Sequence, residues 1–140
     1  MALPTTIELQ IVTPDKLVLK ENVDEVEIPG SQGYFGVLPG HTPLLALLGT
    51  GEMWYRRGSE THHLLISSGF AEVQPDAVTI LAQIAERAGD IDVARAEAAK
   101  RRAEERMARP TMDMDYERAR LALLKSLIRL QVATRVRIRS

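Results

Sequence analysis

The chain has 140 residues, of which 45% are apolar and 26% charged, a balance typical of one or two small globular domains. It contains no cysteine, which excludes a disulfide framework, a thiolate zinc site and a cysteine nucleophile. The first residues show no basic region followed by an apolar run, so the sequence predicts no signal peptide. No stretch approaches the roughly 18 apolar residues of a membrane span.

The formal net charge of −1 hides a difference between the two parts of the chain. Residues 1–85 contain four Lys/Arg and ten Asp/Glu, net −6, whereas residues 86–140 contain fourteen and nine, net +5. Five of the six aromatic residues and eight of the nine glycines also lie in the first part. These shifts predict two domains of different type, residues 1–86 and residues 87–140.

Residues 1–86 alternate between turn signals and short runs of period-two hydrophobicity. Ile7, Leu9 and Ile11 form one such run, and residues 78–84 form another. Many short strands at this spacing are typical of a β-sandwich or barrel. His62 and His63 are adjacent in a strand pattern, so they point to opposite faces and cannot chelate one metal ion. The segment offers no catalytic residue and no metal ligand set, and we therefore interpret it as non-catalytic.

Residues 87–140 are rich in strong helix formers. We expect a first helix with Asp90 as its N-cap and Asp92 in its first turn, ended by Pro110. Asp113 is a candidate cap for a second, longer helix that begins near Tyr116. The short connection predicts an antiparallel hairpin. The predicted fold is α+β, an N-terminal β-sandwich followed by a C-terminal antiparallel two-helix hairpin.

The second helix has more apolar surface than an alanine-rich partner can cover. Two rows of large apolar residues run along it: Leu121, Leu124, Ile128, Val132 and Val136 in one, and Leu123, Leu127 and Leu130 in the other. Such an excess marks a docking surface. The alternatives are that the helices complete the core of a single α+β domain, or that the hairpin docks on partners.

The pattern of the basic residues 87–140 does not by itself decide what this part of the chain does. One interpretation is a nucleic-acid-binding module that uses the basic helices, and another is a generic partner-binding module. Glutamates interleave the basic residues, which favours solvated intrahelical ion pairs over a nucleic-acid arm.

Three segments carry a resemblance to a known family. They read GSQGYFGVLPGHTPLL (30–45), SSGFAEVQPDAVTILA (67–82) and IDVARA (91–96). In this order the chain resembles the epsilon subunit of bacterial F-type ATP synthase, over essentially its full length.

The resemblance implies a non-catalytic central-stalk (rotor) subunit of a proton-translocating ATP synthase that couples the catalytic head to the c-ring. Its β-sandwich is expected to bind the gamma subunit and the c-ring. Its hairpin is expected to reach the alpha and beta subunits and inhibit ATP hydrolysis. The implied location is the cytoplasmic face of the bacterial plasma membrane, peripheral and through the complex only, with no nucleic-acid partner.

The resemblance also suggests two sets of site residues. Ser31, Tyr34 and His41 are the candidates for the c-ring and gamma interface, with Tyr34 standing where members often carry an acidic residue. No cofactor is required, but ATP is a candidate regulatory ligand because residues 91–96 match the motif Ile/Leu-Asp-x-x-Arg-Ala. The family's ATP contacts map onto Glu86, Ile91, Asp92, Arg95, Ala96, Arg102, Lys125 and Arg129.

The spacing of these residues fits the chemistry of a triphosphate. Arg95 and Arg102 are seven residues apart and share a helical face, and Lys125 and Arg129 are four apart on the other helix. In an antiparallel hairpin these pairs converge, and guanidinium groups offer paired donors to phosphate. Lys125 stands where the best-binding members carry arginine, so it keeps the charge without the bidentate geometry.

Overall fold

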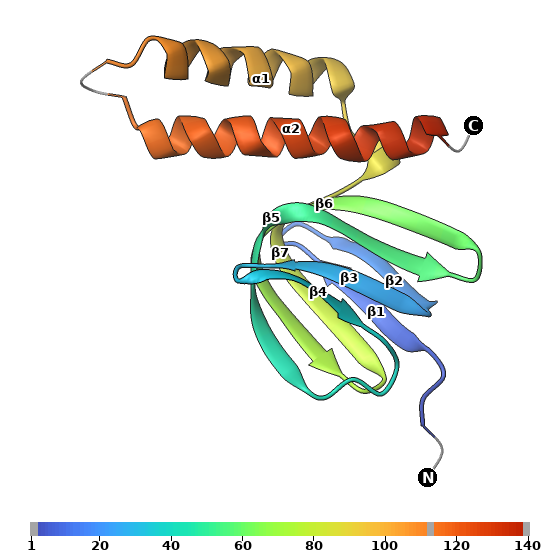
Figure 1. The fold of residues 1–140 in the computed structure, drawn as a ribbon. Helices are drawn as coiled ribbons and strands as arrows, with labels where there is room; N and C mark the ends of the chain where they lie inside the picture. The colour runs from blue at the N-terminus through green and yellow to red at the C-terminus, as the bar shows by residue number, and fades with distance from the viewer. Residues whose placement is uncertain (1–2, 112–113, 139–140) are drawn as a thin grey trace. The chain divides into compact units, whose positions relative to one another are not determined.

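The computed structural model describes residues 3–111 and 114–138 of the chain (Figure 1). Contacts between Cα atoms divide the chain into two compact units, Met1–Glu86 and Arg87–Ser140. We call them the β unit and the helical unit.

Among the described residues, the β unit has seven strands in one hydrogen-bonded sheet. The strands are β1 (Ile7–Val12), β2 (Leu17–Val23), β3 (Glu25–Gly30), β4 (Gly33–Val37), β5 (Leu44–Arg57), β6 (Glu60–Gln74) and β7 (Ala77–Arg87). Their order in the sheet is β2-β1-β7-β6-β5-β3-β4. Strand β1 runs parallel to β7, whereas the β1–β2, β3–β4, β3–β5 and β5–β6 pairs are antiparallel.

The sheet folds over a single core. Side chains from all seven strands join one buried cluster, including Leu19 and Val23 of the edge strand β2 and Val37 of the opposite edge strand β4. The alternating residues Ile7, Leu9 and Ile11 are fully buried, as their period predicts. Since both edges of the sheet reach the same core, the sheet curls into two facing layers, the predicted β-sandwich.

A bend in the middle of the two longest strands makes this curl possible. Ser68 and Gly69 of β6 have φ angles of 61° and 130°, and the β5–β6 ladder skips the pair Gly49–Ser68. A Cβ on Gly69 would overlap the carbonyl oxygen of Leu81 on β7. Figure 1 shows β5 and β6 curving along their length. The Ser-Gly-Phe motif is therefore the place where the backbone turns and approaches its neighbour closely.

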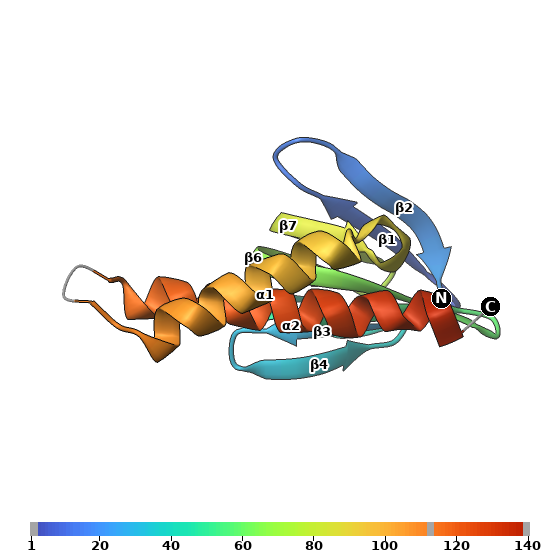
Figure 2. The same ribbon diagram turned by 90° about the horizontal axis from the view of Figure 1, so that it is seen from above.

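The helical unit contains a short 3₁₀ helix, η1 (Ala88–Asp90), followed by α1 (Val93–Ala108) and α2 (Tyr116–Ile138). The helices α1 and α2 lie side by side and run in opposite directions (Figures 1 and 2). The α+β fold with a two-helix hairpin is thus confirmed. Helix α1 ends before Pro110, as expected from the steric restriction that proline imposes on its predecessor.

The predicted helix starts need correction. Asp90 lies inside η1 and does not cap α1, because the chain turns once more before the helix begins. The N-cap is Asp92, whose side chain accepts a hydrogen bond from the backbone N–H of Arg95. The predicted second cap, Asp113, lies outside the described residues. Asp115 makes the equivalent bond at the start of α2, to the N–H of Arg118.

Candidate functional site

A hollow of about 590 Å³ lies beside the β3–β4 turn and the start of β5. Residues 30–35 and 44–47 line it, and none of them is charged. Leu44, Leu45 and Leu47 expose 41%, 69% and 58% of their surface. The backbone N–H of Ser31 donates to the carbonyl oxygen of Leu47 across 2.9 Å, which ties the turn to β5. The result is a fixed, largely apolar surface of the kind that binds another protein.

Tyr34 is held in place although more than half of it is exposed. Its hydroxyl oxygen accepts a hydrogen bond from the backbone N–H of Glu52 across 3.2 Å. The tip of its ring lies over Gly51, where an added Cβ would overlap that hydroxyl. The absence of a side chain at Gly51 therefore makes room for Tyr34, and the ring is presented to solvent in a defined position.

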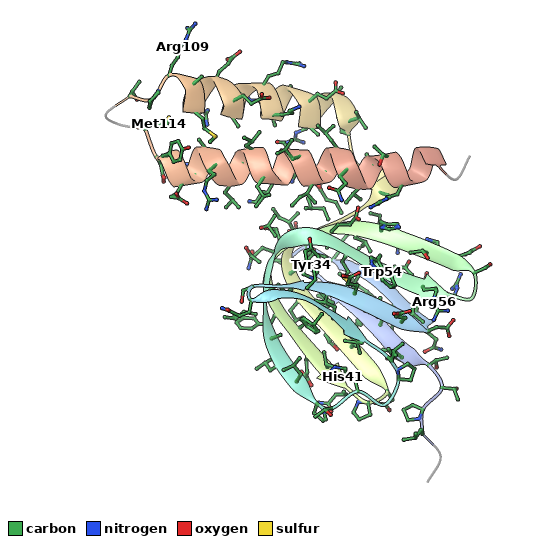
Figure 3. All side chains as sticks on the ribbon, in the orientation of Figure 1. Tyr34, His41, Trp54, Arg56, Arg109 and Met114 are labelled. Atoms are coloured by element: carbon green, nitrogen blue, oxygen red, sulfur yellow. The ribbon has the colours of Figure 1, made fainter. Side chains whose placement is uncertain are left out.

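The three candidate interface residues do not form one cluster. Ser31 and Tyr34 line the same hollow, whereas His41 does not. His41 follows the other end of β4, where its Nδ1 lies 2.6 Å from the carbonyl oxygen of Thr42, and Figure 3 shows it well apart from Tyr34. Any single partner that touches all three must extend along β4.

The exposed leucines of β5 were not predicted from the sequence. Leu47 lies opposite Phe70 in the β5–β6 register, and Phe70 is 47% exposed. The two side chains therefore share one face of the sheet. The run Leu44–Leu48 breaks the alternation of a half-buried strand, and this was the available signal that both of its faces carry apolar side chains.

Polar pairs follow on the same two strands. The hydroxyl oxygens of Thr50 and Ser67 lie 2.7 Å apart, and Oε1 of Glu52 lies 3.6 Å from Nδ1 of His63. His62 instead stacks on Tyr55, with ring centroids 5.0 Å apart. The two histidines thus have separate surroundings, as their adjacency on a strand predicts. Among the described residues, no group of three or more His, Asp and Glu side chains has the arrangement of a metal site.

The candidate nucleotide motif, residues 91–96, lies at the start of α1. Oδ1 of Asp92 accepts the hydrogen bond from the N–H of Arg95 at 3.0 Å, so this carboxylate satisfies a backbone donor that the helix start leaves free. Arg95 is exposed, Ile91 is half-buried and Ala96 is 3% exposed. Of these residues, the guanidinium of Arg95 is therefore the group best placed to meet a solvent-borne anion.

The remaining nucleotide candidates are spread over the helices. Arg95 lies 13 residues before Ala108, the end of α1, and Arg129 lies 13 residues after Tyr116, the start of α2. In an antiparallel hairpin these two cations stand at about the same height, roughly 20 Å from the turn. Arg102 and Lys125 lie nearer the turn, whereas Glu86 belongs to the β unit. The hairpin topology therefore brings the cations of α1 and α2 to neighbouring levels.

The packing between α1 and α2 uses small residues at a seven-residue spacing that was not predicted from the sequence. The buried residues of α1 are Ala96 and Ala103, seven positions apart. On α2, Ala119, Ser126 and Ala133 are buried at the same spacing. A seven-residue repeat keeps each set on one helical face, and small side chains there allow close approach of the helices. The heptad spacing of alanines was the signal that could have revealed this face.

The large apolar side chains of α2 are only partly buried. Leu121, Leu124 and Leu127 are 40–44% exposed, and Leu123, Ile128 and Leu130 are half-buried. Val132 is fully buried, while the side chain of Val136 lies outside those described. The predicted surplus of apolar surface on α2 is thus present at three leucines.

The fold and these surfaces define a class of protein, a two-unit binding protein with apolar surface presented on both units. No helix in the described part of the chain is both long and apolar enough to cross a lipid bilayer.

Comparison with known proteins then gives the family. Residues 6–88 match the beta-sandwich domain of the ATP synthase delta/epsilon chain, and residues 90–134 match its long alpha-helix domain. The ATP synthase epsilon chain of Nitratidesulfovibrio vulgaris strain DP4 is 51% identical over 127 residues, which cover 91% of this chain and 95% of that one. The epsilon chain of Syntrophobacter fumaroxidans is 52% identical, also over 127 residues that cover 91% of this chain and 95% of that one.

Two solved structures share the fold. A chain of the Euglena gracilis mitochondrial ATP synthase superposes with a TM-score of 0.71 at 23% identity, covering 99% of this chain and 83% of that one. A chain in the structure of the Tetrahymena thermophila mitochondrial ATP synthase central stalk and c-ring superposes with a TM-score of 0.56 at 15% identity, covering 96% of this chain and 98% of that one. The chain belongs to the ATP synthase epsilon-chain family, and it is a non-catalytic accessory subunit of that complex.

Proposed function

We propose that this subunit is part of the rotating central stalk of a proton-translocating ATP synthase, where it couples the catalytic head to the c-ring and inhibits ATP hydrolysis through its helical hairpin. The observation that carries the proposal is the apolar surface exposed on both units. Leu45 and Leu47 on the β unit and Leu124 and Leu127 on the helical unit each expose 40% or more of their surface. Exposed leucines in such density indicate binding to other subunits.

The β unit, residues 1–86, is the proposed docking domain for the gamma subunit and the c-ring. The hollow beside Ser31 and Tyr34 supports a firm contact because its backbone is tied to β5 and its lining is uncharged. His41 extends the proposed surface along β4. Through this contact the subunit would sit peripherally on the cytoplasmic face of the bacterial plasma membrane, held there by the complex.

The helical unit, residues 87–140, is the proposed inhibitory element that contacts the alpha and beta subunits. Deleting residues 88–140 should abolish inhibition of ATP hydrolysis in the assembled enzyme and leave assembly through the β unit intact. The measurement is the ATPase rate of the complex with the full chain and with the truncated one. Equal rates for the two complexes would contradict the inhibitory role.

A finer variant tests the exposed leucines themselves. Replacing Leu121, Leu124 and Leu127 together by glutamine keeps helix propensity and removes the apolar surface. The proposal expects hydrolysis to rise toward the rate of the truncated complex. The matched control replaces the exposed Arg101, Glu104 and Glu105 of α1 by glutamine, and it should leave inhibition in place. Loss of inhibition in the control alone would contradict the role of the leucines.

ATP is the proposed regulatory ligand of the hairpin. The exposed Arg95 stands at about the height of Arg129 on α2, so both helices supply positive charge at one level of the hairpin, as a triphosphate requires. We expect two states of the hairpin, one with α1 and α2 packed together that does not inhibit and one that inhibits. If ATP binds only the packed state, it stabilises that state by mass action. Calorimetric titration of the chain tests this, with Arg95→Ala expected to abolish the heat and the exposed Arg101→Ala to keep it. No heat from the parent chain at millimolar ATP would exclude the sensing role.

A further inference from the structure

The nucleotide motif has a near copy in the helical unit, with Met114 in place of the Ile or Leu. Residues 91–96 read Ile-Asp-Val-Ala-Arg-Ala, and residues 114–119 read Met-Asp-Tyr-Glu-Arg-Ala. Both segments share an apolar residue, an aspartate, two variable positions, an arginine and an alanine. The first segment opens α1 and the second opens α2.

The two copies also have the same backbone geometry. Oδ1 of Asp92 accepts from the N–H of Arg95 at 3.0 Å, and Oδ1 of Asp115 accepts from the N–H of Arg118 at 3.1 Å. The carbonyl oxygens of the same aspartates accept from the N–H groups of Ala96 and Ala119, at 3.0 and 3.1 Å. Each aspartate thus satisfies two donors of the first turn, which is the role of a helix N-cap.

The alanine of each copy begins the contact between the helices. Ala96 and Ala119 are 3% and 2% exposed, and each lies four residues after its capping aspartate. The buried small residues then continue seven positions later, at Ala103 on α1 and Ser126 on α2. Since the cap fixes where a helix begins, it also fixes which residues reach the facing helix.

We propose that Asp92 and Ala96 act on the hairpin and not on the nucleotide. Asp92 is a positioning residue that starts α1 and so sets where the Arg95 side chain leaves the helix, while Ala96 sets the distance between the helices. Arg95 is then the one member of its motif left to meet the phosphates. This inference rests on the proposed nucleotide binding. It follows that the short motif marks the hairpin architecture, and that ATP binding depends on the cations of the two helices.

Variants of the two aspartates in the full chain test the cap. Asparagine and serine keep a capping oxygen. The variants Asp92→Asn and Asp92→Ser should therefore have a helix-unfolding equilibrium constant and an ATP affinity within about twofold of those of the parent chain. Asp92→Ala should lower the helix-forming equilibrium about fivefold, and Asp115→Ala, the matched variant, should do the same. Unfolding is followed by circular dichroism at 222 nm and binding by calorimetry.

Base preference separates a cap from a ligand contact. A carboxylate that bonds the adenine amino group would set the preference for ATP over GTP, whereas a cap would not. The shorter serine keeps the capping oxygen but removes the carboxylate that would reach the base, so we expect Asp92→Ser to leave the ratio of ATP to GTP affinities unchanged. A loss of ATP binding of tenfold or more in Asp92→Ser with intact helicity, or a changed ratio, would overturn the positioning role. Unchanged helical unfolding in Asp92→Ala would overturn the cap.

The claim that Ala96 sets the distance between the helices is tested with a matched control. Ala96→Leu and Ala119→Leu should lower helical stability alike, because both force the helices apart, and Ala94→Leu on the exposed side of α1 should not. Equal stability of all three variants would overturn the spacing role. Absence of ATP binding in the parent chain would overturn the proposed nucleotide function and the assignment of Arg95. The unfolding data for the aspartate and alanine variants would still decide the architecture.

Discussion

The bend at Gly69 offers a sharp test of how the β unit closes. We predict that Gly69→Ala strongly destabilises the β unit, because two separate effects act at this position. The φ angle of 130° lies in a region that L residues rarely adopt. In addition, the new Cβ would overlap the carbonyl oxygen of Leu81, a backbone atom that cannot swing away.

The size of the effect follows from these two contributions. Holding a non-glycine residue in such a backbone conformation costs about 1–3 kcal/mol. Relieving the overlap by shifting β6 against β7 costs about 1–3 kcal/mol more, as for other overpacked sites. The expected loss of about 2–6 kcal/mol is a large fraction of the roughly 5–15 kcal/mol that stabilises an ordinary domain.

Gly58→Ala is the matched control. Gly58 also has a positive φ angle, 62°, but an added Cβ would meet nothing within 4 Å. Its left-handed conformation costs an alanine about 1–2 kcal/mol, partly offset by about 0.4–1 kcal/mol from the unfolded chain. We therefore expect Gly58→Ala to lose only about 1 kcal/mol.

The assay is urea unfolding of the full chain, followed by tryptophan fluorescence. Trp54 is the single tryptophan of the sequence and lies on β5, so its signal reports on the β unit. The Gly69→Ala midpoint should fall well below that of Gly58→Ala, or the variant should be unfolded without urea. If Gly69→Ala is as stable as Gly58→Ala, our explanation of the bend is refuted.

Substitutions at three further positions have defined expectations in unfolding assays of the same kind. Ser68→Gly should raise β-unit stability by about 0.5 kcal/mol, because serine is strained at its φ angle of 61°; a loss of stability would contradict this. Ser126→Leu should cost the helical unit about 1–3 kcal/mol by overpacking, whereas Ser126→Ala should cost under about 0.5 kcal/mol, since its hydroxyl only adds a bond to the carbonyl oxygen of Ala122. Tyr34→Phe should lose about 0.5–1 kcal/mol through its bond to Glu52, and a neutral result would argue against that bond.

Local patterns were enough to predict much of the architecture. The alternation of Ile7, Leu9 and Ile11 predicted a buried strand face because side chains on a strand repeat every two residues. The alanine- and glutamate-rich run ending at Pro110 predicted α1 for an equally local reason, since helix propensity and the proline restriction act within a few residues. The family resemblance rested on ordered motifs that remain readable without coordinates.

Positions set by competition between neighbouring groups were harder to predict. Asp90 and Asp92 both suit a helix start, and the choice of Asp92 depended on the extra turn of η1 before α1. The apolar rows of α2 predicted a surplus of apolar surface, yet beside Val132 the buried residues of α2 are the small Ala119, Ser126 and Ala133. Helices approach most closely where side chains are smallest, and this preference involves both helices at once.

By itself, the sequence determined two domains of different type, the class of each, the absence of cysteine chemistry and the family. Only the tertiary structure decided that Ser31 and Tyr34 share a hollow with the leucines of β5 while His41 stands apart. It also decided that the Ser-Gly-Phe motif is a bend pressed against Leu81. The physical reason is range: propensity and periodicity act between near neighbours in the chain, whereas a hollow or a close backbone approach joins strands that are distant in sequence.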